Sequence, residues 1–86
     1  MMADKEKVER LLKTARGQID GILRMIEEDR YCIDVSNQIM AAQSILKRVN
    51  YEILSAHLLG CVKNANDEEY DSKIEELLSV MQSMSK

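Results

Sequence analysis

Apolar side chains recur at helical spacing through the first part of the chain. They fall three or four residues apart, on one side of a helix with 3.6 residues per turn: Val8, Leu11, Leu12, Ala15, Ile19, Ile22, Leu23 and Ile26. Asp4 stands just before this pattern and predicts an N-cap, because its carboxylate can accept a free amide N–H of the first turn. The polar run at 27–31 interrupts the pattern and indicates a turn. We therefore expect one amphipathic helix over about residues 4–28.

A second helical segment, over about residues 32–63, is apolar on more than one side. Its main stripe is Val35, Ile39, Ala42, Leu46, Val49, Ile53 and Ala56. Further apolar residues lie off that stripe: Met40, Ala41, Ile45, Leu54, Leu58, Leu59 and Val62. A surface helix needs only one apolar stripe. Two apolar sides predict that this helix packs both on the first helix and on another subunit.

A third helix is expected over about residues 67–84. It follows a turn at 64–67 and carries apolar residues at helical spacing: Ile74, Leu77, Leu78, Met81 and Met84. The chain has 86 residues, no proline and three glycines, which favours an all-α fold throughout. Residues 1–86 are long enough for one domain only. So small a core usually needs a metal or a partner subunit to be stable.

Charge and cysteine content narrow the class of protein. The formal net charge is −3, and the acidity is concentrated after residue 63, which leaves room for a basic surface on the first two helices. Two cysteines are too few for a disulfide framework. No apolar run is long enough to span a bilayer, and the N-terminus lacks the apolar stretch of a signal peptide. We therefore expect a cytoplasmic protein without a membrane partner.

One histidine and two cysteines are the residues best suited to bind a metal. His57 and Cys61 lie four residues apart, so they share one side of a helix. Cys32 precedes His57 by 25 residues in the same expected helix, which corresponds to about 37 Å. The three residues cannot meet within one subunit unless that helix breaks. They can meet if two copies pair antiparallel about a two-fold axis near Ile45, which creates two identical sites.

The chemistry of this ligand set favours a soft metal ion. Two thiolates and one imidazole suit Cu(I), and also Zn(II) if a fourth ligand completes a tetrahedron. No second histidine is present, and no oxygen ligands cluster beside the pair. We therefore expect Cu(I) rather than Ni(II) or Co(II).

The motifs resemble those of the copper-sensing repressor family (CsoR/RcnR-like). The matching segments are 16–22 (RGQIDGI), 25–32 (MIEEDRYC), 43–44, 46–48 and the His57-x-x-x-Cys61 pair. The resemblance implies a three-helix subunit that forms antiparallel dimers and then a dimer-of-dimers tetramer. It also implies an apo tetramer that binds operator DNA and is released by metal. The family ligands correspond to Cys32 of one subunit and His57 and Cys61 of another.

The resemblance also distinguishes subgroups and suggests two supporting residues. Nickel- and cobalt-responsive members use extra histidines, whereas residues 1–31 contain none here. Persulfide-sensing members lack the histidine, and formaldehyde-sensing members lack the second cysteine. Copper sensing, with derepression of copper-resistance genes, is the remaining match. Tyr31 and Glu76 match residues that join the hydrogen-bond network around the ligand histidine, whose other ring nitrogen needs a partner.

Operator contacts are expected from basic residues on the first two helices. The candidates are Arg10, Lys13, Arg16, Lys47 and Arg48. Arg16 and Arg48 match basic positions of the family, but Leu11 stands where the family often has arginine. No helix-turn-helix, zinc-finger or basic-zipper pattern is present. Several copies of these side chains on a tetramer would neutralise several phosphates.

Two other functions are compatible with the same residues. A thiol-based redox or sulfide sensor would use Cys32 and Cys61 as an intersubunit pair, although it would not need His57. A copper-binding helical bundle would never touch DNA, and gel-shift binding would distinguish it. An enzyme is not expected, because the chain offers no set of nucleophile, base and orienting group.

Overall fold

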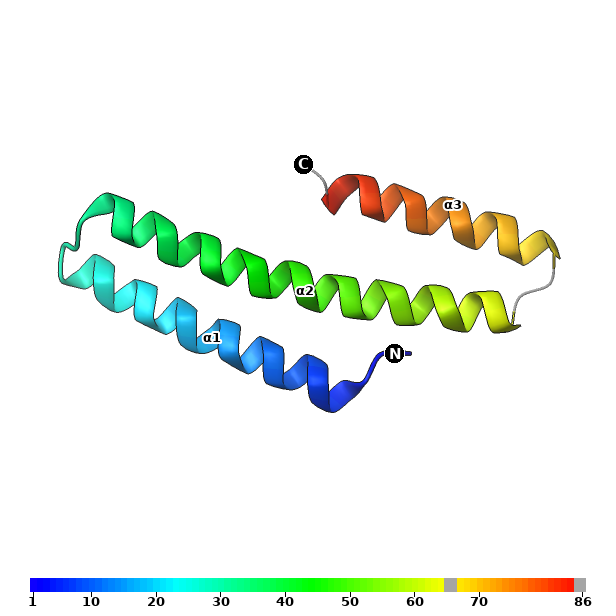
Figure 1. Ribbon diagram of the computed structural model, residues 1–86, viewed down its shortest axis with the longest axis horizontal. Helices are drawn as coiled ribbons and strands as arrows, with labels where there is room; N and C mark the ends of the chain where they lie inside the picture. The colour runs from blue at the N-terminus through cyan, green and yellow to red at the C-terminus, as the bar shows by residue number, and fades with distance from the viewer. Residues whose placement is uncertain (65–66, 85–86) are drawn as a thin grey trace.

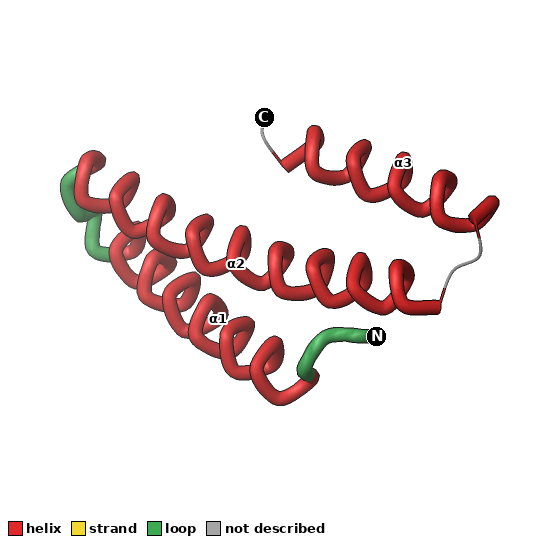
Figure 2. Tube along the Cα trace, turned by 45° about the vertical axis from the view of Figure 1, so that its right-hand side comes forward, coloured by secondary structure: helices red, strands yellow, loops and turns green. Residues whose placement is uncertain are grey.

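The protein consists of three α-helices in the order α1 (Lys5–Glu27), α2 (Cys32–Asn64) and α3 (Asp67–Met84) (Figures 1 and 2). The computed structural model describes the backbone of residues 1–64 and 67–84, and the side chains of residues 1–60 and 72–84. Within these ranges there is no strand. The expected helix limits differ from the observed ones by one residue at most, so the all-α, three-helix prediction is confirmed.

Both ends of α1 are closed by local hydrogen bonds. The Asp4 carboxylate accepts the backbone N–H groups of Glu6 and Lys7 at 3.1 and 3.3 Å, which confirms the expected N-cap. At the other end, the N–H of Arg30 donates to the carbonyl of Met25 and the N–H of Asp29 donates to Ile26. This is a Schellman motif, and its left-handed position is held by Asp29 with φ 51°. The turn into α2 is therefore short and defined.

Helices α1 and α2 form an antiparallel hairpin with a small aliphatic core. Figure 1 shows the two helices side by side along most of α1. The buried residues are Val8, Ala15 and Ile22 on α1 and Ala42 and Val49 on α2. These positions recur every seven residues on each helix, as in a coiled-coil seam. Near the open end of the hairpin, Lys7 Nζ lies 3.0 Å from Glu52 Oε1.

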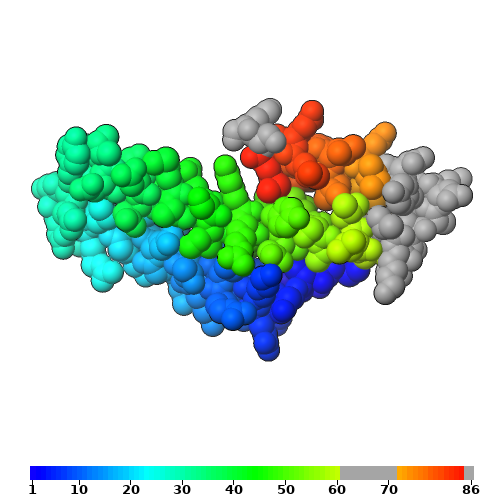
Figure 3. All heavy atoms as spheres, viewed as in Figure 1, coloured from blue at the N-terminus to red at the C-terminus, as the bar shows by residue number. Residues whose placement is uncertain are grey.

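Helix α3 folds back along the second half of α2 and packs on it less closely. Leu77 is its one buried residue among those whose side chains are described. Leu77, Met81 and Met84 line a groove of about 350 Å³ between the two helices, together with Tyr51, Leu54, Ser55 and Leu58. Figure 3 shows that α3 covers only this half of α2. None of the helices, as far as they are described, is long and apolar enough to cross a bilayer.

The three helices lie in a single layer rather than around a shared core. The molecule measures 56 × 28 × 12 Å, and its radius of gyration is 17.0 Å. A compact chain of this length has a radius of gyration of about 12 Å. The accessible area is 6841 Å², whereas about 5,200 Å² is usual for a folded monomer of this mass. A layer one helix thick leaves apolar surface exposed, which a partner subunit can cover. That residues 1–86 form one independent domain stays a prediction.

Candidate metal centre

Cys32 is the first residue of α2 and follows directly from the Schellman turn. Its thiol is free and exposed. It lies in a surface groove of about 350 Å³ that begins at the end of α1 and continues along α2. The lining residues are Ile26, Asp29, Arg30, Cys32, Val35, Ser36 and Ile39. The local turn thus presents the thiol at one end of the molecule, where a second subunit can reach it.

His57 and Cys61 lie near the opposite end of α2. His57 is partly buried, and Cys61 follows one turn later in the same helix. The side chain of Cys61 lies outside the described residues, so only its place on the helix is known. That place puts both residues on one side of α2, four positions apart.

Helix α2 keeps Cys32 away from the other two expected ligands within one subunit. The helix is continuous from Cys32 to Asn64, so Cys32 and His57 are about 37 Å apart along it. Among the described side chains, no three His, Cys, Asp or Glu residues gather as a metal site. At about 100° per residue, however, all three expected ligands fall within roughly 40° of each other around α2. They share one side of the helix although they lie at opposite ends.

The side of the hairpin that carries Cys32 also carries exposed apolar residues. Ile26 of α1 and Ile39 of α2 line the groove around Cys32 and are 56% and 42% exposed. The same apolar side includes Leu12, Ile19, Leu23, Ile26, Ile39 and Leu46, all of them exposed in the single subunit. An exposed apolar surface of this extent is typical of a protein interface. The sequence predicted a second apolar side of α2, but not its continuation onto α1.

The structure separates the two residues expected to support the ligand histidine. Tyr31 directly precedes Cys32, is 69% exposed and lies at the far end of α2 from His57 of its own subunit. Glu76 is exposed on α3 and directly precedes Leu77, which contacts the same groove as Ser55 and Leu58 of α2. His57 lies between Ser55 and Leu58 in the sequence. Glu76 is therefore level with His57 within one subunit, whereas Tyr31 can reach a His57 only across a dimer.

A further residue near this end of α2 was not found from the sequence. The Met2 side chain lies against Gly60, so closely that a Cβ on Gly60 would collide with the Met2 methyl group. Gly60 directly precedes Cys61. Figure 1 shows the N-terminus beside the second half of α2. A methionine far away in sequence gives no periodic signal that would predict this contact.

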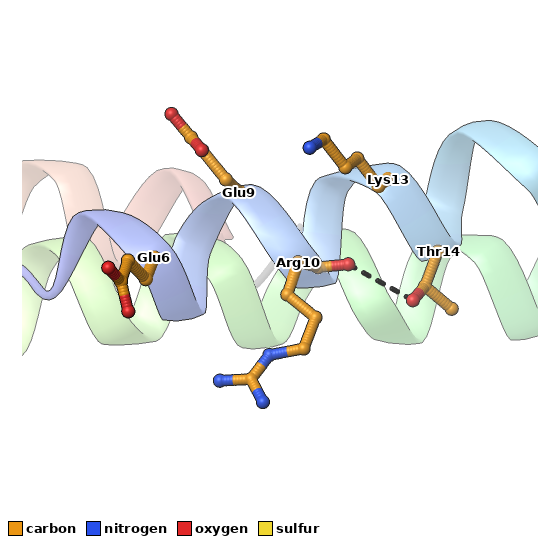
Figure 4. Close-up of a pocket in the computed structure, with 5 residues that line it drawn as sticks. All are labelled: Glu6, Glu9, Arg10, Lys13 and Thr14. Carbon is orange, nitrogen blue, oxygen red and sulfur yellow. Dashed lines mark hydrogen bonds between the residues drawn. The ribbon is translucent and has the colours of Figure 1, made fainter.

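The expected DNA-binding residues do not form a single basic surface on one subunit. Arg10 and Lys13 line a shallow pocket on α1, but Glu6 and Glu9 line it too (Figure 4). The two basic side chains point in different directions there, and Thr14 Oγ1 donates to the Arg10 carbonyl at 3.0 Å.

The remaining basic candidates are distributed around the hairpin. Arg16 follows the buried Ala15 and Arg48 precedes the buried Val49, so on antiparallel helices these two arginines flank the seam from opposite sides. Lys47 is exposed beside Leu46 in another shallow hollow of α2. A continuous basic surface therefore requires more than one subunit.

Comparison with known proteins places this chain in one family. Residues 4–83 match the family described as metal-sensitive transcriptional repressors. The chain belongs to this family. It is 48% identical over 71 residues to the copper-sensing transcriptional repressor CsoR of Mycobacterium bovis, a match that covers 81% of this chain and 60% of that protein. It is 37% identical over 84 residues to CsoR of Bacillus subtilis, covering 96% of this chain and 83% of that protein.

Solved structures show the same fold. The copper-sensing repressor CsoR with Cu(I) from Geobacillus thermodenitrificans is similar with a TM-score of 0.76 at 29% identity, covering 100% of this chain and 94% of that one. The nickel-responsive transcriptional regulator InrS is similar with a TM-score of 0.80 at 26% identity, covering 98% and 96%. The resemblance to the copper-sensing repressor family is thus confirmed. The chain spans about 60% of the length of the mycobacterial relatives.

Proposed function

We propose that this protein is a subunit of a Cu(I)-responsive transcriptional repressor, with a metal site made of Cys32 from one subunit and His57 and Cys61 from an antiparallel partner. One observation carries the proposal. The three soft ligands lie on one side of an unbroken α2 but at its opposite ends. An antiparallel copy of α2 brings them together twice, once at each end. The exposed apolar residues on the same side supply the contact surface that such a dimer needs.

The donor set fits Cu(I). Two thiolates and an imidazole are soft ligands, and three of them suffice for this ion. The fold alone does not select the metal, since a nickel-responsive regulator shares it. Selection must come from the side chains, and a chain with one histidine cannot offer the nitrogen-rich set that Ni(II) prefers. The relatives named as copper-sensing repressors support the same choice.

The protein's own residues supply a route from the site to the rest of the subunit. A ligand imidazole donates its second ring N–H to a carboxylate, carbonyl or hydroxyl, which fixes the ring orientation. Glu76 is level with His57 and belongs to α3, which packs on α2 less closely than α1 does. Tyr31 of the opposite subunit is the other candidate. Occupation of the site would then favour one position of α3 against the dimer.

Operator DNA is the proposed partner of the apo form. The candidate contacts are Arg10, Lys13, Arg16, Lys47 and Arg48, and their dispersal on one subunit favours a tetramer built as a dimer of dimers. Phosphate contacts of this kind give affinity that falls steeply with salt. Replacing Arg16 or Arg48 by alanine should weaken operator binding by the apo protein and flatten its salt dependence. Affinity for Cu(I) should change little.

The decisive experiment is an anaerobic Cu(I) titration of the protein bound to fluorescent operator DNA, at a fixed salt concentration close to that of a cytoplasm. We expect release near one Cu(I) per subunit, with X-ray absorption showing copper–sulfur scattering. Parallel titrations with Zn(II) and Ni(II) test the choice of metal. Release by a thiol oxidant or a sulfide donor, with Cu(I) inactive, would instead identify the thiol sensor. Tight Cu(I) binding without any operator binding would identify a copper-binding bundle.

A further inference from the structure

Between the two ends of the metal site, one side of α2 alternates polar and apolar residues, and two of the polar ones carry amides. Starting at Cys32, side chains on this side follow at alternating steps of four and three: Ser36, Ile39, Gln43, Leu46, Asn50, Ile53 and His57. This is the spacing of a coiled-coil seam. Gln43 and Asn50 are exposed in the single subunit and line a shallow hollow of about 440 Å³ with Leu46. As far as the described residues go, neither amide has a hydrogen-bond partner in its own chain.

We infer that Gln43 of one subunit pairs with Asn50 of the other, and that these two pairs fix the register of the antiparallel α2 helices. Gln43 lies eleven residues inward from Cys32, and Asn50 lies eleven residues inward from Cys61. Aligning Cys32 with Cys61 of the other copy therefore also aligns Gln43 with Asn50. The two-fold axis repeats this pair on its other side. The inference rests on the antiparallel dimer of the proposed function.

Primary amides are complementary to each other. The Gln43 amide N–H can donate to the Asn50 side-chain oxygen, and the Asn50 amide N–H can donate to the Gln43 oxygen. In the same alignment, Ile39 faces the apolar pair Ile53–Leu54, so apolar residues meet apolar residues. The occupant of this side is thus a second copy of the same chain, because one two-fold rotation brings together both the amide pair and the apolar residues Ile39 and Ile53–Leu54.

The amides discriminate against the neighbouring register. If the helices slip by four residues, Cys32 becomes level with His57, Gln43 faces Leu46 and Asn50 faces Ile39. Four amides per dimer would then be buried without partners, which disfavours that register. Apolar residues alone would distinguish the two registers poorly. Polar residues in a coiled-coil seam specify register in this way, although an apolar seam associates more tightly.

A spin-label experiment tests the register without any metal. The label is attached at Asp34→Cys in a chain with Cys32→Ser and Cys61→Ser, and electron–electron distances are measured between the two subunits. We expect one narrow distance for the two labels of each antiparallel dimer. With Gln43→Leu and Asn50→Leu added, the subunits should still associate, but a second population should appear, shifted by about 6 Å for a slip of four residues. The matched control, Asn37→Leu with Gln82→Leu, removes the same two side-chain types elsewhere and should keep the single distance.

A swap variant shows whether a changed distance comes from loss of the amide pair or from a folding defect. Gln43→Asn with Asn50→Gln keeps the amide pair and should keep the single distance. Either single leucine variant leaves two amides per dimer unpaired, one in each pair, and should weaken dimerisation about tenfold or more, whereas the double variant should recover it. An unchanged distance in the double leucine variant, or a lost one in the swap, would overturn the inference. If the parent chain shows no antiparallel distance, the shared metal site of the proposed function fails as well.

Discussion

The two ends of α2 are built differently, although both are expected to bind the same metal ion. At the Cys32 end, a Schellman turn with Asp29 at φ 51° fixes the backbone, and the groove around the thiol is lined by residues close in sequence. At the His57 end, the surroundings come from distant segments: Met2 lies against Gly60, and Leu77 of α3 packs near Leu58. One end is held by local geometry and the other by long-range packing.

This difference indicates where a binding event can be transmitted. A residue held by its own turn has little freedom to move when a ligand binds. Helix α3, with Leu77 as its buried residue in the described part, can change position at a lower cost in free energy. We therefore expect Cys32 to contribute to capture of the metal, and the His57 end to couple capture to DNA release.

The largest expected effect is the loss of either thiolate. Cys32→Ala and Cys61→Ala should each lower Cu(I) affinity by roughly 100-fold or more, since soft sulfur ligands dominate the affinity for this ion. Competition with a Cu(I) chelator measures it. In a heterodimer of the two variants, one site keeps all three ligands and the other lacks both thiolates. Mixing the variants should therefore restore one intact site per heterodimer. No recovery on mixing would show that the three ligands do not come from two subunits.

The next effect separates capture from coupling. His57→Ala should keep substantial Cu(I) affinity, because both thiolates remain, but should lose most of the metal-dependent release from DNA. A typical coupling free energy is about 1–3 kcal/mol, and it is measured from operator affinities with and without Cu(I) at fixed salt. Glu76→Gln, which keeps the shape of the side chain, should reduce the same coupling. If His57→Ala dissociates from operator on Cu(I) addition as the parent does, the histidine is a ligand only.

Local features of this molecule could be predicted from the sequence, and contacts between distant segments could not. Helical periodicity located all three helices, and the length of α2 alone ruled out an intrachain Cys32–His57 site. The polar run at 27–31 predicted a turn but not the left-handed backbone of Asp29. The contact of Met2 with Gly60 and the level of Glu76 beside His57 depend on how whole helices pack. Packing of that kind leaves no periodic pattern in one sequence.

A smaller effect is expected at the Cys32 end of α2, where the Schellman turn fixes the backbone. Asp29→Gly should raise the free energy of unfolding by up to about 1 kcal/mol, because glycine adopts positive φ without the Cβ clash and removes a negative charge from the C-terminus of α1. Denaturant titration at fixed protein concentration measures it. Asp29→Asn is the control, since asparagine tolerates the same backbone and removes only the charge. Destabilisation by glycine would mean that the Asp29 side chain makes a stabilising contact across the dimer.

The smallest effect concerns the ion pair between Lys7 and Glu52, near the open end of the α1–α2 hairpin. Lys7 and Glu52 are 45 residues apart in sequence and 3.0 Å apart in space, with side chains 38% and 28% exposed. Solvent screens a pair of this exposure, so a double-mutant cycle with Lys7→Met and Glu52→Gln should give a coupling of about 0.5 kcal/mol that shrinks as salt is raised. The pair joins α1 to α2, and no described residue of α3 takes part in it. The cycle should therefore leave the Cu(I)-dependent change in operator affinity unaltered. A reduced change would mean that the signal from His57 also passes through the hairpin, and that α3 is not the only mobile element at that end.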